Sequence, residues 1–315
     1  GPDDFNLCLK NNIPSKYTVD NAGLYTTEVP YFTGTHIFKA DPLVIEKLKE
    51  EKKLLKSDKL RHSYPHSWRS KAPLIYRATP QWFISMESHG LRKKALKALD
   101  DTKFYPDKGR ERIKAMIETR PDWCVSRQRV WGVPLPIFVH KTTKEILIDD
   151  NVNENIASIY EKEGSDCWFS DSPQRFLGDK YKAEDYEKIS DIVEVWFDSG
   201  CTHAFVLEKR EDLQWPASMY LEGSDQHRGW FHSSLLESCG TRGRAPYESI
   251  LSHGFVVDGK GLKMSKSVGN VIAPEDILKK YGADILRIWV ASSNYAEDLR
   301  IDYSILEQHA DSYRK

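Results

Sequence analysis

The stretch that most constrains the fold is 254–270, where an apolar segment runs directly into a glycine-bearing loop. The segment from Ile250 to Val257 predicts a strand, and the residues after the loop predict a helix that begins at Pro274 and ends before Gly282. A strand, a loop and a helix in this order are typical of a doubly wound parallel sheet, in which ligands bind outside the carboxyl ends of the strands.

The loop itself is suited to binding phosphate. Its glycines (Gly259, Gly261 and Gly269) let the backbone approach an anion closely. The ammonium groups of Lys263 and Lys266 are compact charges that can stabilise a departing pyrophosphate, and Ser265 and Ser267 add neutral donors. The alternative is a solvated basic turn, and the strand before the loop and the helix after it favour the phosphate site.

Two earlier segments predict further strands of the same sheet. Residues 192–197 indicate a buried strand that ends in a turn at 198–200. Residues 218–221 indicate another, followed by a tight turn over 222–225 in which Asp225 caps the helix that follows. Three groups are then expected to converge at one rim: Trp196 with Asp198, Glu222 through Gln226, and Lys263 through Ser267.

Composition limits the class of protein. A chain of 315 residues, 30% charged and 40% hydrophobic, is ordinary globular material for about two domains, and it has no apolar run long enough to span a membrane. Five scattered cysteines, with no Cys-x-x-Cys pair, disfavour a disulfide framework and a zinc ribbon and favour a reducing cytosol. The formal net charge of −1 means that any RNA contact must come from a local basic surface.

The first part of the chain predicts a small mixed unit over residues 1–62. Short strands and turns are expected over 25–34 and a charged helix over 42–59. The proline-rich residues 63–84 predict a β-ribbon between two bodies. His62 and His66 are conceivable metal ligands, but with no cysteine nearby we favour packing or hydrogen bonding for both.

The middle and end of the chain alternate predicted helices with less regular segments. Helices are expected over 91–99, 109–120 and 283–291, the last burying Ile285, Leu286, Trp289 and Val290. Arg127 and Arg129 lie among aromatic residues that either stack on a nucleotide or pack. Residues 140–188 are polar and without a motif, and we interpret them as an irregular insertion.

Several of these segments together resemble the class I aminoacyl-tRNA synthetases. The string Lys-Met-Ser-Lys-Ser over 263–267 is similar to their signature, and the segments 122–134, 195–200, 221–231 and 281–287 are similar to the isoleucyl branch of the bacterial type. Residues 77–83 favour that branch over the valyl and leucyl branches.

The resemblance covers nearly the whole chain and implies an α/β fold. It assigns residues 85–270 to the second half of a Rossmann-like doubly wound sheet with an insertion at about 140–188. Residues 1–62 would be the C-terminal part of a β-rich editing insertion, 63–84 a linker, and 271–315 the first helices of a region that contacts the tRNA stem.

The family's reaction joins isoleucine to ATP as an adenylate, transfers it to tRNA(Ile) and hydrolyses mischarged valine. By resemblance, Lys263 and Lys266 stabilise the transition state, and the ATP-binding residues are Lys266, Ser267, His253, Gly254 and Val256. The adenylate-binding residues are Glu222, Gly223, Asp225, Gln226, Trp196 and Trp230, with core packing as the alternative for either tryptophan. Asp4 is the candidate editing residue, with a solvated chain end as the alternative. Magnesium with ATP, no zinc, and a cytoplasmic monomer are implied.

The chain also departs from the family pattern. The His-Ile-Gly-His signature of the other half of the phosphate site is absent from these residues, and Glu194 stands where aspartate is usual. We therefore interpret the chain as an internal fragment that does not activate isoleucine alone. A fragment of a valyl or leucyl enzyme, and a non-catalytic tRNA-binding module, are the alternatives.

Overall fold

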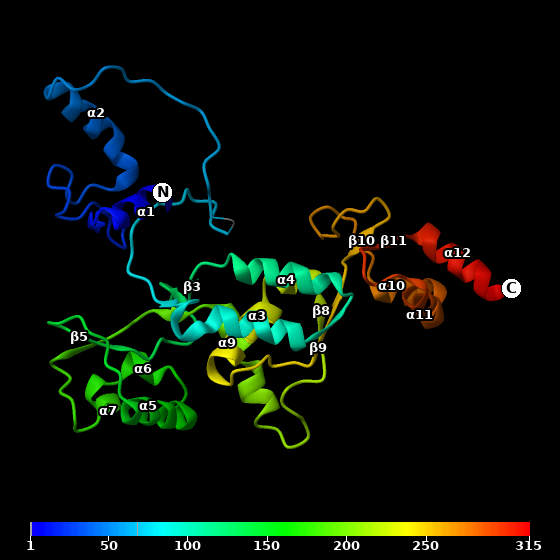
Figure 1. The fold of residues 1–315 in the computed structure, drawn as a ribbon. Coiled ribbons are helices and arrows are strands. Elements are labelled where there is room, and N and C mark those ends of the chain that lie inside the picture. The colour runs from blue at the N-terminus through cyan, green and yellow to red at the C-terminus, as the bar shows by residue number, and fades with distance from the viewer. Residues whose placement is uncertain (1, 68) are drawn as a thin grey trace. The chain divides into compact units, whose positions relative to one another are not determined.

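The computed structural model describes residues 2–67 and 69–315. The chain divides into two compact units, Gly1–Pro80 and Gln81–Lys315, each of which is described by itself (Figure 1). Gly1, which opens the motif containing the predicted editing residue, lies outside the described residues. Within the described part of the chain, no helix has the length and apolarity required to cross a membrane.

The first unit is built from short helices and turns. It contains α1 (Pro2–Lys10), the 3-10 helix η1 (Ile37–Lys39) and α2 (Ala40–Glu50). The strands expected over 25–34 are wrong: Tyr25 forms only an isolated bridge to Val19. The Asp20 carboxylate accepts hydrogen bonds from the backbone N–H groups of Ala22 and Leu24, at 2.8 and 2.9 Å, and folds this segment into a turn.

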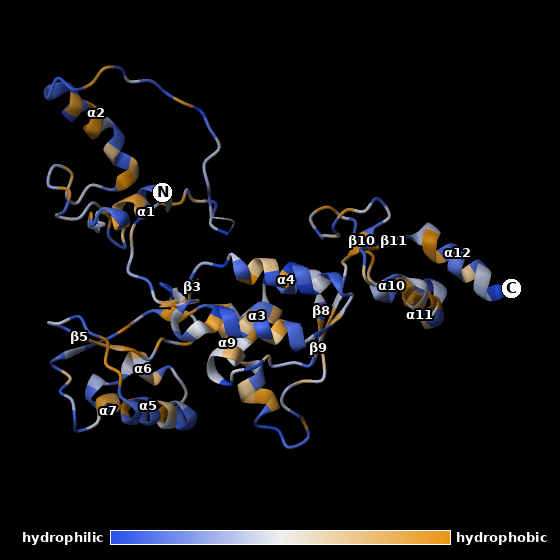
Figure 2. Cartoon of the chain, viewed as in Figure 1, coloured by the Kyte–Doolittle hydropathy of each residue, from blue (hydrophilic) through white to orange (hydrophobic). Residues whose placement is uncertain are grey.

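The prediction of a helix over 42–59 is correct for its first half only. Its apolar stripe is visible as alternating orange and blue along α2 in Figure 2, but the helix ends at Glu50 and residues 53–65 have no regular structure. Among the described residues of 63–84, the expected β-ribbon is reduced to an isolated bridge between His66 and Pro73 and a two-residue strand, Phe83–Ile84, which pairs with residues 123–124. His62 and His66 each place Nδ1 within hydrogen-bonding distance of a neighbouring carbonyl, at 2.9 and 2.7 Å, as the hydrogen-bonding interpretation expects.

The second unit holds the remaining elements. Its strands are β1 (Phe83–Ile84), β2 (Lys103–Tyr105), β3 (Trp123–Cys124), β4 (Ser126–Arg127), β5 (Phe138–His140), β6 (Tyr186–Lys188), β7 (Ile192–Val193), β8 (Tyr220–Gly223), β9 (Ser249–His253), β10 (Val256–Asp258) and β11 (Leu299–Ile301). Its α-helices are α3 (Leu91–Asp101), α4 (Lys108–Glu118), α5 (Asp150–Glu163), α6 (Cys167–Ser170), α7 (Pro173–Leu177), α8 (Val195–Gly200), α9 (Trp230–Thr241), α10 (Pro274–Tyr281), α11 (Ala283–Ser292) and α12 (Tyr303–Arg314). Short turns of helix are η2 (Ser88–Gly90), η3 (His203–Leu207) and η4 (Ser224–His227).

A three-stranded parallel sheet with the order β2-β9-β8 organises this unit. Figure 1 shows α3, α4 and α9 gathered around β8 and β9. The shared core is apolar and fully buried at its centre, with Leu99, Ile113, Phe231, Leu235 and Ile250 among its members. The parallel α/β class and the helices predicted over 91–99 and 109–120 are confirmed.

The strand expected over 192–197 is wrong in length and in partner. Only Ile192 and Val193 form β7, which pairs antiparallel with β4 and lies outside the three-stranded sheet. The chain then turns into α8, because the Glu194 side chain accepts a hydrogen bond from the Trp196 N–H and caps the helix. Val195 is consequently 68% exposed, which a strand buried on both faces would not allow.

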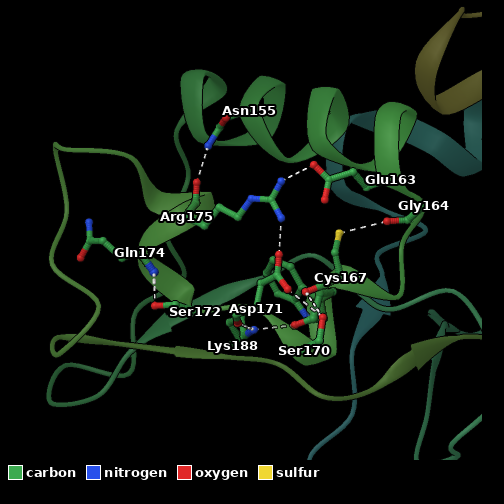
Figure 3. A network of polar contacts seen from close by, with 11 residues as sticks. Asn155, Glu163, Gly164, Cys167, Ser170, Asp171, Ser172, Gln174, Arg175 and Lys188 are labelled. Atoms are coloured by element: carbon green, nitrogen blue, oxygen red, sulfur yellow. Dashed lines mark hydrogen bonds and ion pairs between the residues drawn. The ribbon is translucent and has the colours of Figure 1, made fainter.

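The segment 140–188, which was expected to be an irregular insertion, is regularly folded. Helices α5, α6 and α7 and the β5-β6 pair enclose a core of their own, in which Phe138, Trp168 and Phe176 are completely or almost completely buried. Figure 3 shows Arg175 lying between Glu163 and Asp171, with ion pairs to both. This polar network joins the end of α5 to α6 and α7, and the segment forms a small folded module.

The C-terminal segment has a third core. Strand β10 pairs in parallel with β11, and Ile277, Ile285, Trp289, Ile301 and Leu306 pack beside it from α10, α11, β11 and α12. The helix start at Pro274 and its end at Gly282 are confirmed. The predicted burial of Ile285 and Trp289 is confirmed, and Leu286 is partly buried. The prediction that Val290 is buried is wrong, since this side chain is exposed.

Candidate functional site

The carboxyl ends of β8 and β9 bring some of the predicted adenylate-binding and ATP-binding residues together. In the parallel register, Glu222 lies opposite Ser252 and Gly223 lies opposite His253. A Cβ at position 223 would lie 2.8 Å from Asp225 Oδ1, which shows that the turn folds back closely on the strand end. Glu222 and Gly223, from the predicted adenylate residues, and His253, from the predicted ATP residues, therefore share one edge of the sheet.

The strand and turn boundaries here differ from those expected. Strand β8 covers 220–223 rather than 218–221, so Glu222 and Gly223 end a strand instead of opening a turn. Asp225 does not cap the following helix, which begins at Trp230. Instead, Gln226 caps this helix, because its Oε1 accepts a hydrogen bond from the Trp230 N–H at 2.9 Å.

The two candidate tryptophans have different surroundings. Trp230 stacks on Tyr220 with ring centroids 3.9 Å apart, and its Nε1 donates to the Ser199 carbonyl at 3.0 Å. It therefore joins α8 to α9, as the packing interpretation expects. Trp196 is 41% exposed, and its ring lies so close to Gly229 that a Cβ there would be 2.9 Å from it. Trp196 is therefore the tryptophan that has an open ring face.

Strands β9 and β10 are separated by a break at Gly254 and Phe255, where one continuous strand was expected. A Cβ on Gly254 would lie 2.2 Å from the Glu297 carbonyl oxygen, so only glycine allows the two backbones to approach. The Gly254 N–H donates to the Tyr295 carbonyl at 2.9 Å, and the Phe255 N–H donates to Asp298 Oδ1 at 2.8 Å. This break redirects the chain from the first sheet to the second, and β10 leads into the lysine loop.

Two residues that the sequence did not single out hold the lysine loop in shape. Asp258 accepts hydrogen bonds from the Lys260 and Leu262 N–H groups and, at 2.9 Å, from the Asn270 side chain. Hydrogen bonding from Asn270, and then from the Leu262 N–H, lowers the pKa of the Asp258 carboxyl. Asn270 Oδ1 also accepts from the Ser265 N–H at 2.9 Å. The sequence does contain a signal for these two roles: Asp258 stands just before the loop and Asn270 just after it, and both residue types commonly bind turn backbone through their side chains.

The ammonium groups of Lys263 and Lys266 are available to bind a ligand. Both side chains are exposed, and neither forms an ion pair or a side-chain hydrogen bond within the described part of the chain. Ser265 and Ser267 hydroxyls lie 3.2 Å apart beside them. The loop follows β10 and belongs to a different sheet from Glu222, so the expectation that all three groups lie on the rim of one sheet is wrong. Fixed backbone with free positive charge is the arrangement that an incoming polyphosphate requires.

Behind α8 lies a buried acidic group that the sequence analysis missed. Glu237, on α9, is only 8% exposed, and burial raises the pKa of its carboxyl to about 8. Its Oε1 is so close to Gly200 that a Cβ there would be 2.3 Å away. The nearby Asp198 also has a raised pKa, from burial and from the Glu194 charge. The underside of α8 is therefore a low-dielectric region in which Glu237 is neutral near pH 7.

The remaining predicted site residues are placed as follows. Val256 begins β10 and is exposed, and Ser267 is exposed in the lysine loop. Asp4 is exposed in the first turn of α1, in the first unit. Among the described residues, no group of three or more His, Cys, Asp and Glu side chains could hold a metal ion.

Comparison with known proteins identifies the family. The sequence model of the tRNA synthetases class I (I, L, M and V) matches residues 15–302. The chain belongs to the class I tRNA synthetases. Over all 315 residues it is 92% identical to an isoleucine--tRNA ligase of Pelagibacter ubique and, over 330 aligned positions, 52% identical to one of Zymomonas mobilis. The resemblance to the isoleucyl branch is confirmed.

The class I synthetase fold is also seen in solved structures. A Mycobacterium tuberculosis methionyl-tRNA synthetase in complex with methionyl-adenylate matches 81% of this chain and 42% of its own, with a TM-score of 0.51 and 18% identity. The chain spans about a third of the length of the curated ligases it matches, 35% for each of the two named above.

Proposed function

We propose that this chain forms the lysine-loop half of the active site of an isoleucine--tRNA ligase, which activates isoleucine with ATP and transfers it to tRNA(Ile). The observation that carries the proposal is the β8-β9 register, which sets Glu222 and Gly223 beside Ser252 and His253 at one sheet edge. The 92% identity to an isoleucine--tRNA ligase of Pelagibacter ubique supports the same assignment.

The proposed roles follow from the charge and exposure of each group. Lys263 and Lys266 bind the phosphates of ATP and stabilise the pyrophosphate as it leaves, with Ser267 as a neutral donor. His253, Gly254 and Val256 contact the nucleotide. Glu222, with Gly223, Asp225 and Gln226, holds the ammonium and ribose of the adenylate, since a buried ammonium requires a carboxylate. Trp196 supplies an apolar wall for the aliphatic side chain.

Magnesium belongs to the proposal as the partner of the ATP phosphates. Mg²⁺ is commonly bound through substrate phosphates and one or two carboxylates and keeps several waters, so the absence of an all-protein cluster among the described residues is compatible with this role. We propose no zinc site in this chain.

The domain assignment is also a proposal. Residues 1–62 would belong to an editing domain that removes mischarged valine, with Asp4 gripping the ammonium of the misplaced residue. Residues 63–84 would link it to the catalytic half over 85–270, and residues 271–315 would contact the tRNA stem. We further propose a cytoplasmic monomer.

Amino-acid-dependent exchange of pyrophosphate into ATP tests the function. The protein to use is the Pelagibacter ubique ligase carrying these 315 residues in place of its matching segment, here termed the grafted ligase. We expect exchange with isoleucine, weaker exchange with valine by a factor of about 100, and none with leucine. We also expect no exchange by the 315-residue chain alone, because it lacks the His-Ile-Gly-His half of the phosphate site. Preference for valine or leucine would refute the isoleucyl assignment, and tRNA binding without any exchange would favour the non-catalytic module.

A further inference from the structure

A pocket of about 260 Å³ lies behind α8 in the second unit. Phe197 and Cys201, which are four positions apart and share one side of the chain, line it from α8 and the residue that follows. Helix α9 lines it with its C-terminal half, and β1, α3, β3 and η3 supply further residues. None of the described residues that line the pocket belongs to the site proposed above, so a ligand here would occupy a separate site.

The walls of the pocket are mostly apolar. Its large apolar side chains are Ile84, Leu91, Trp123, Phe197 and Leu236. The Trp123 indole N–H is already donated to Glu194, so it adds no polar contact. An apolar cavity of about 150 Å³ holds benzene, and drug-sized ligands usually occupy about 300 Å³ or more. A pocket of this volume therefore has room for one ring with a small substituent.

The carboxyl of Glu237 is the first of two buried polar groups in these walls. Neither of its oxygens has a hydrogen-bond partner of ordinary geometry among the described residues, and only the weakly donating Cys201 thiol interacts with it. Because burial raises its pKa to about 8, the carboxyl is protonated near pH 7. A protonated carboxyl offers one O–H donor and one carbonyl acceptor.

The imidazole of His203 is the second group. Its Nδ1 lies 3.0 Å from the Gly200 carbonyl, which can only accept, so Nδ1 carries the proton. Nε2 is then an acceptor, and it is buried without a partner among the described residues. Burial lowers the pKa of His203, which keeps the ring neutral. The pocket thus contains one further acceptor that is unsatisfied.

The charges around these two groups limit what the pocket can hold. Arg242, which also lines the pocket, donates to both oxygens of Glu208, at 2.9 and 2.8 Å. Glu194 and Asp198, from the α8 segment, raise the pKa of Glu237 further. Near pH 7 the pocket therefore presents a neutral acid, a neutral imidazole and a paired guanidinium. An ionised ligand would lose its hydration there without gaining a free opposite charge.

We propose that this pocket binds a small uncharged molecule with an apolar body and one group, such as a primary amide, that both donates and accepts hydrogen bonds. An amide N–H donates to the carbonyl oxygen of the Glu237 acid, and the acid O–H donates to the amide oxygen. The second amide N–H remains for His203 Nε2. Buried polar atoms without partners are costly, so a ligand that satisfies them is favoured over a purely apolar one. This inference does not depend on the proposed function.

The test measures the dissociation constant of the grafted ligase for benzamide, by ligand-detected NMR titration at pH 7. We expect saturable binding to one site, with a dissociation constant on the order of 1 mM for a ligand of this size. Glu237→Leu should weaken benzamide binding by about 10-fold, because two hydrogen bonds are lost. Glu237→Gln, which keeps a donor and an acceptor, should stay within about threefold of the parent. Toluene, which has no polar group, should bind the parent and Glu237→Leu alike.

Gly240 provides a second, independent pair of variants. It lines the same pocket, and a Cβ there meets only Leu91 Cδ1, at 3.7 Å, so a larger side chain has room to enter. Gly240→Leu should occupy the space and weaken benzamide binding by about 10-fold or more, whereas Gly240→Ala should stay within about threefold. Thermal unfolding shows whether each variant is folded. If Glu237→Leu is not, the Gly240 pair still decides.

Three results would overturn the proposal. The first is no saturable binding of benzamide by the parent, or equal affinity of the parent and the Glu237→Leu and Gly240→Leu variants. The second is binding of benzylamine or benzoate as tightly as benzamide, since the ligand would then be charged. The third is displacement of benzamide by saturating isoleucine and ATP, which would place it in the adenylate site. A grafted ligase that shows no pyrophosphate exchange would refute the proposed function and leave this test unaffected.

Discussion

The Glu194 carboxylate accepts a hydrogen bond from the Trp123 indole N–H at 2.9 Å, although the two residues are 71 positions apart. The second oxygen of the same carboxylate accepts from the Trp196 N–H at 3.2 Å and lies 3.7 Å from the Arg127 guanidinium. One buried side chain therefore joins the 123–127 segment to the first turn of α8.

Removing this carboxylate should destabilise the chain. Glu194→Ala leaves the Trp123 N–H buried without an acceptor, and we expect the free energy of unfolding in urea to fall by about 2–3 kcal/mol. Glu194→Asp, one methylene shorter, should lose one of the two hydrogen bonds, at about 1 kcal/mol. The matched control is Glu187→Ala, an exposed glutamate on β6, for which a change of less than about 0.5 kcal/mol is expected. Equal losses at 194 and 187 would contradict the assignment.

Glu237 should make stability depend on pH. Its carboxyl ionises near pH 4.5 when unfolded but, because burial raises its pKa, only near pH 8 when folded. Between these values the folded state binds a proton that the unfolded state has released, so the free energy of unfolding should fall as pH rises from about 4.5 to about 8 and level off above.

The variant Glu237→Gln isolates that contribution. It should remove this part of the pH dependence and, at about pH 8, stabilise the chain by on the order of 3 kcal/mol relative to the parent. The control Glu111→Gln, on the exposed side of α4, should leave the pH profile unchanged. A variant profile parallel to that of the parent would show that Glu237 is ionised in the folded state.

Replacing Gly254 or Gly240 by alanine should have opposite effects on stability. Gly254→Ala forces a Cβ to within 2.2 Å of the Glu297 carbonyl, a backbone atom that cannot move aside, so we expect a loss of about 3 kcal/mol or more. Gly240 lies inside α9, and a Cβ there meets only Leu91 Cδ1, at 3.7 Å. Gly240→Ala should therefore stabilise the helix, by about 0.5–1 kcal/mol. Thermal unfolding of both variants measures whether each substitution lowers or raises stability. A tolerated alanine at 254 would be inconsistent with the close approach of the Gly254 and Glu297 backbones.

Gln226 and Asp225 distinguish the observed cap of α9 from the predicted one. Gln226→Ala removes the acceptor of the Trp230 N–H and should cost about 1 kcal/mol of unfolding free energy. Asp225→Ala should cost less than about 0.5 kcal/mol, since Asp225 does not cap that helix. The reverse order would restore the capping role that the sequence suggested for Asp225.

Local sequence patterns predicted the helices well and the strands less well, for a physical reason. Leu91, Ala95 and Leu99 repeat at helical spacing, and α3 forms where they indicate. The run Ile192 to Phe197 has the apolar character of a buried strand, but Glu194 accepts a hydrogen bond from the Trp196 N–H and caps a helix there. No pattern of apolar residues contains that information, because capping depends on one polar side chain.

The candidate site was predicted residue by residue from local motifs, but its assembly was not. The pairing of Gly223 with His253 follows from the parallel sheet that the sequence indicated. The transfer of the lysine loop to a second sheet depends on the pairing of Val256 with Leu299, 43 positions downstream (299 − 256), and no local signal marks it. The fold of the segment 140–188 was missed because its core is built from aromatic residues spread over a polar stretch, such as Trp168 and Phe176.

The central claim is that Lys266 acts on the phosphates of ATP from a loop whose shape is set independently. The most direct measurement is the rate of isoleucine-dependent pyrophosphate exchange by the grafted ligase at saturating ATP. We predict that Lys266→Ala lowers this rate by about 100-fold or more. Lys260→Ala, which removes an exposed lysine from the same loop, should leave the rate within about twofold of the parent, since most exposed surface side chains contribute little. Equal rates for Lys266→Ala and Lys260→Ala would contradict the account.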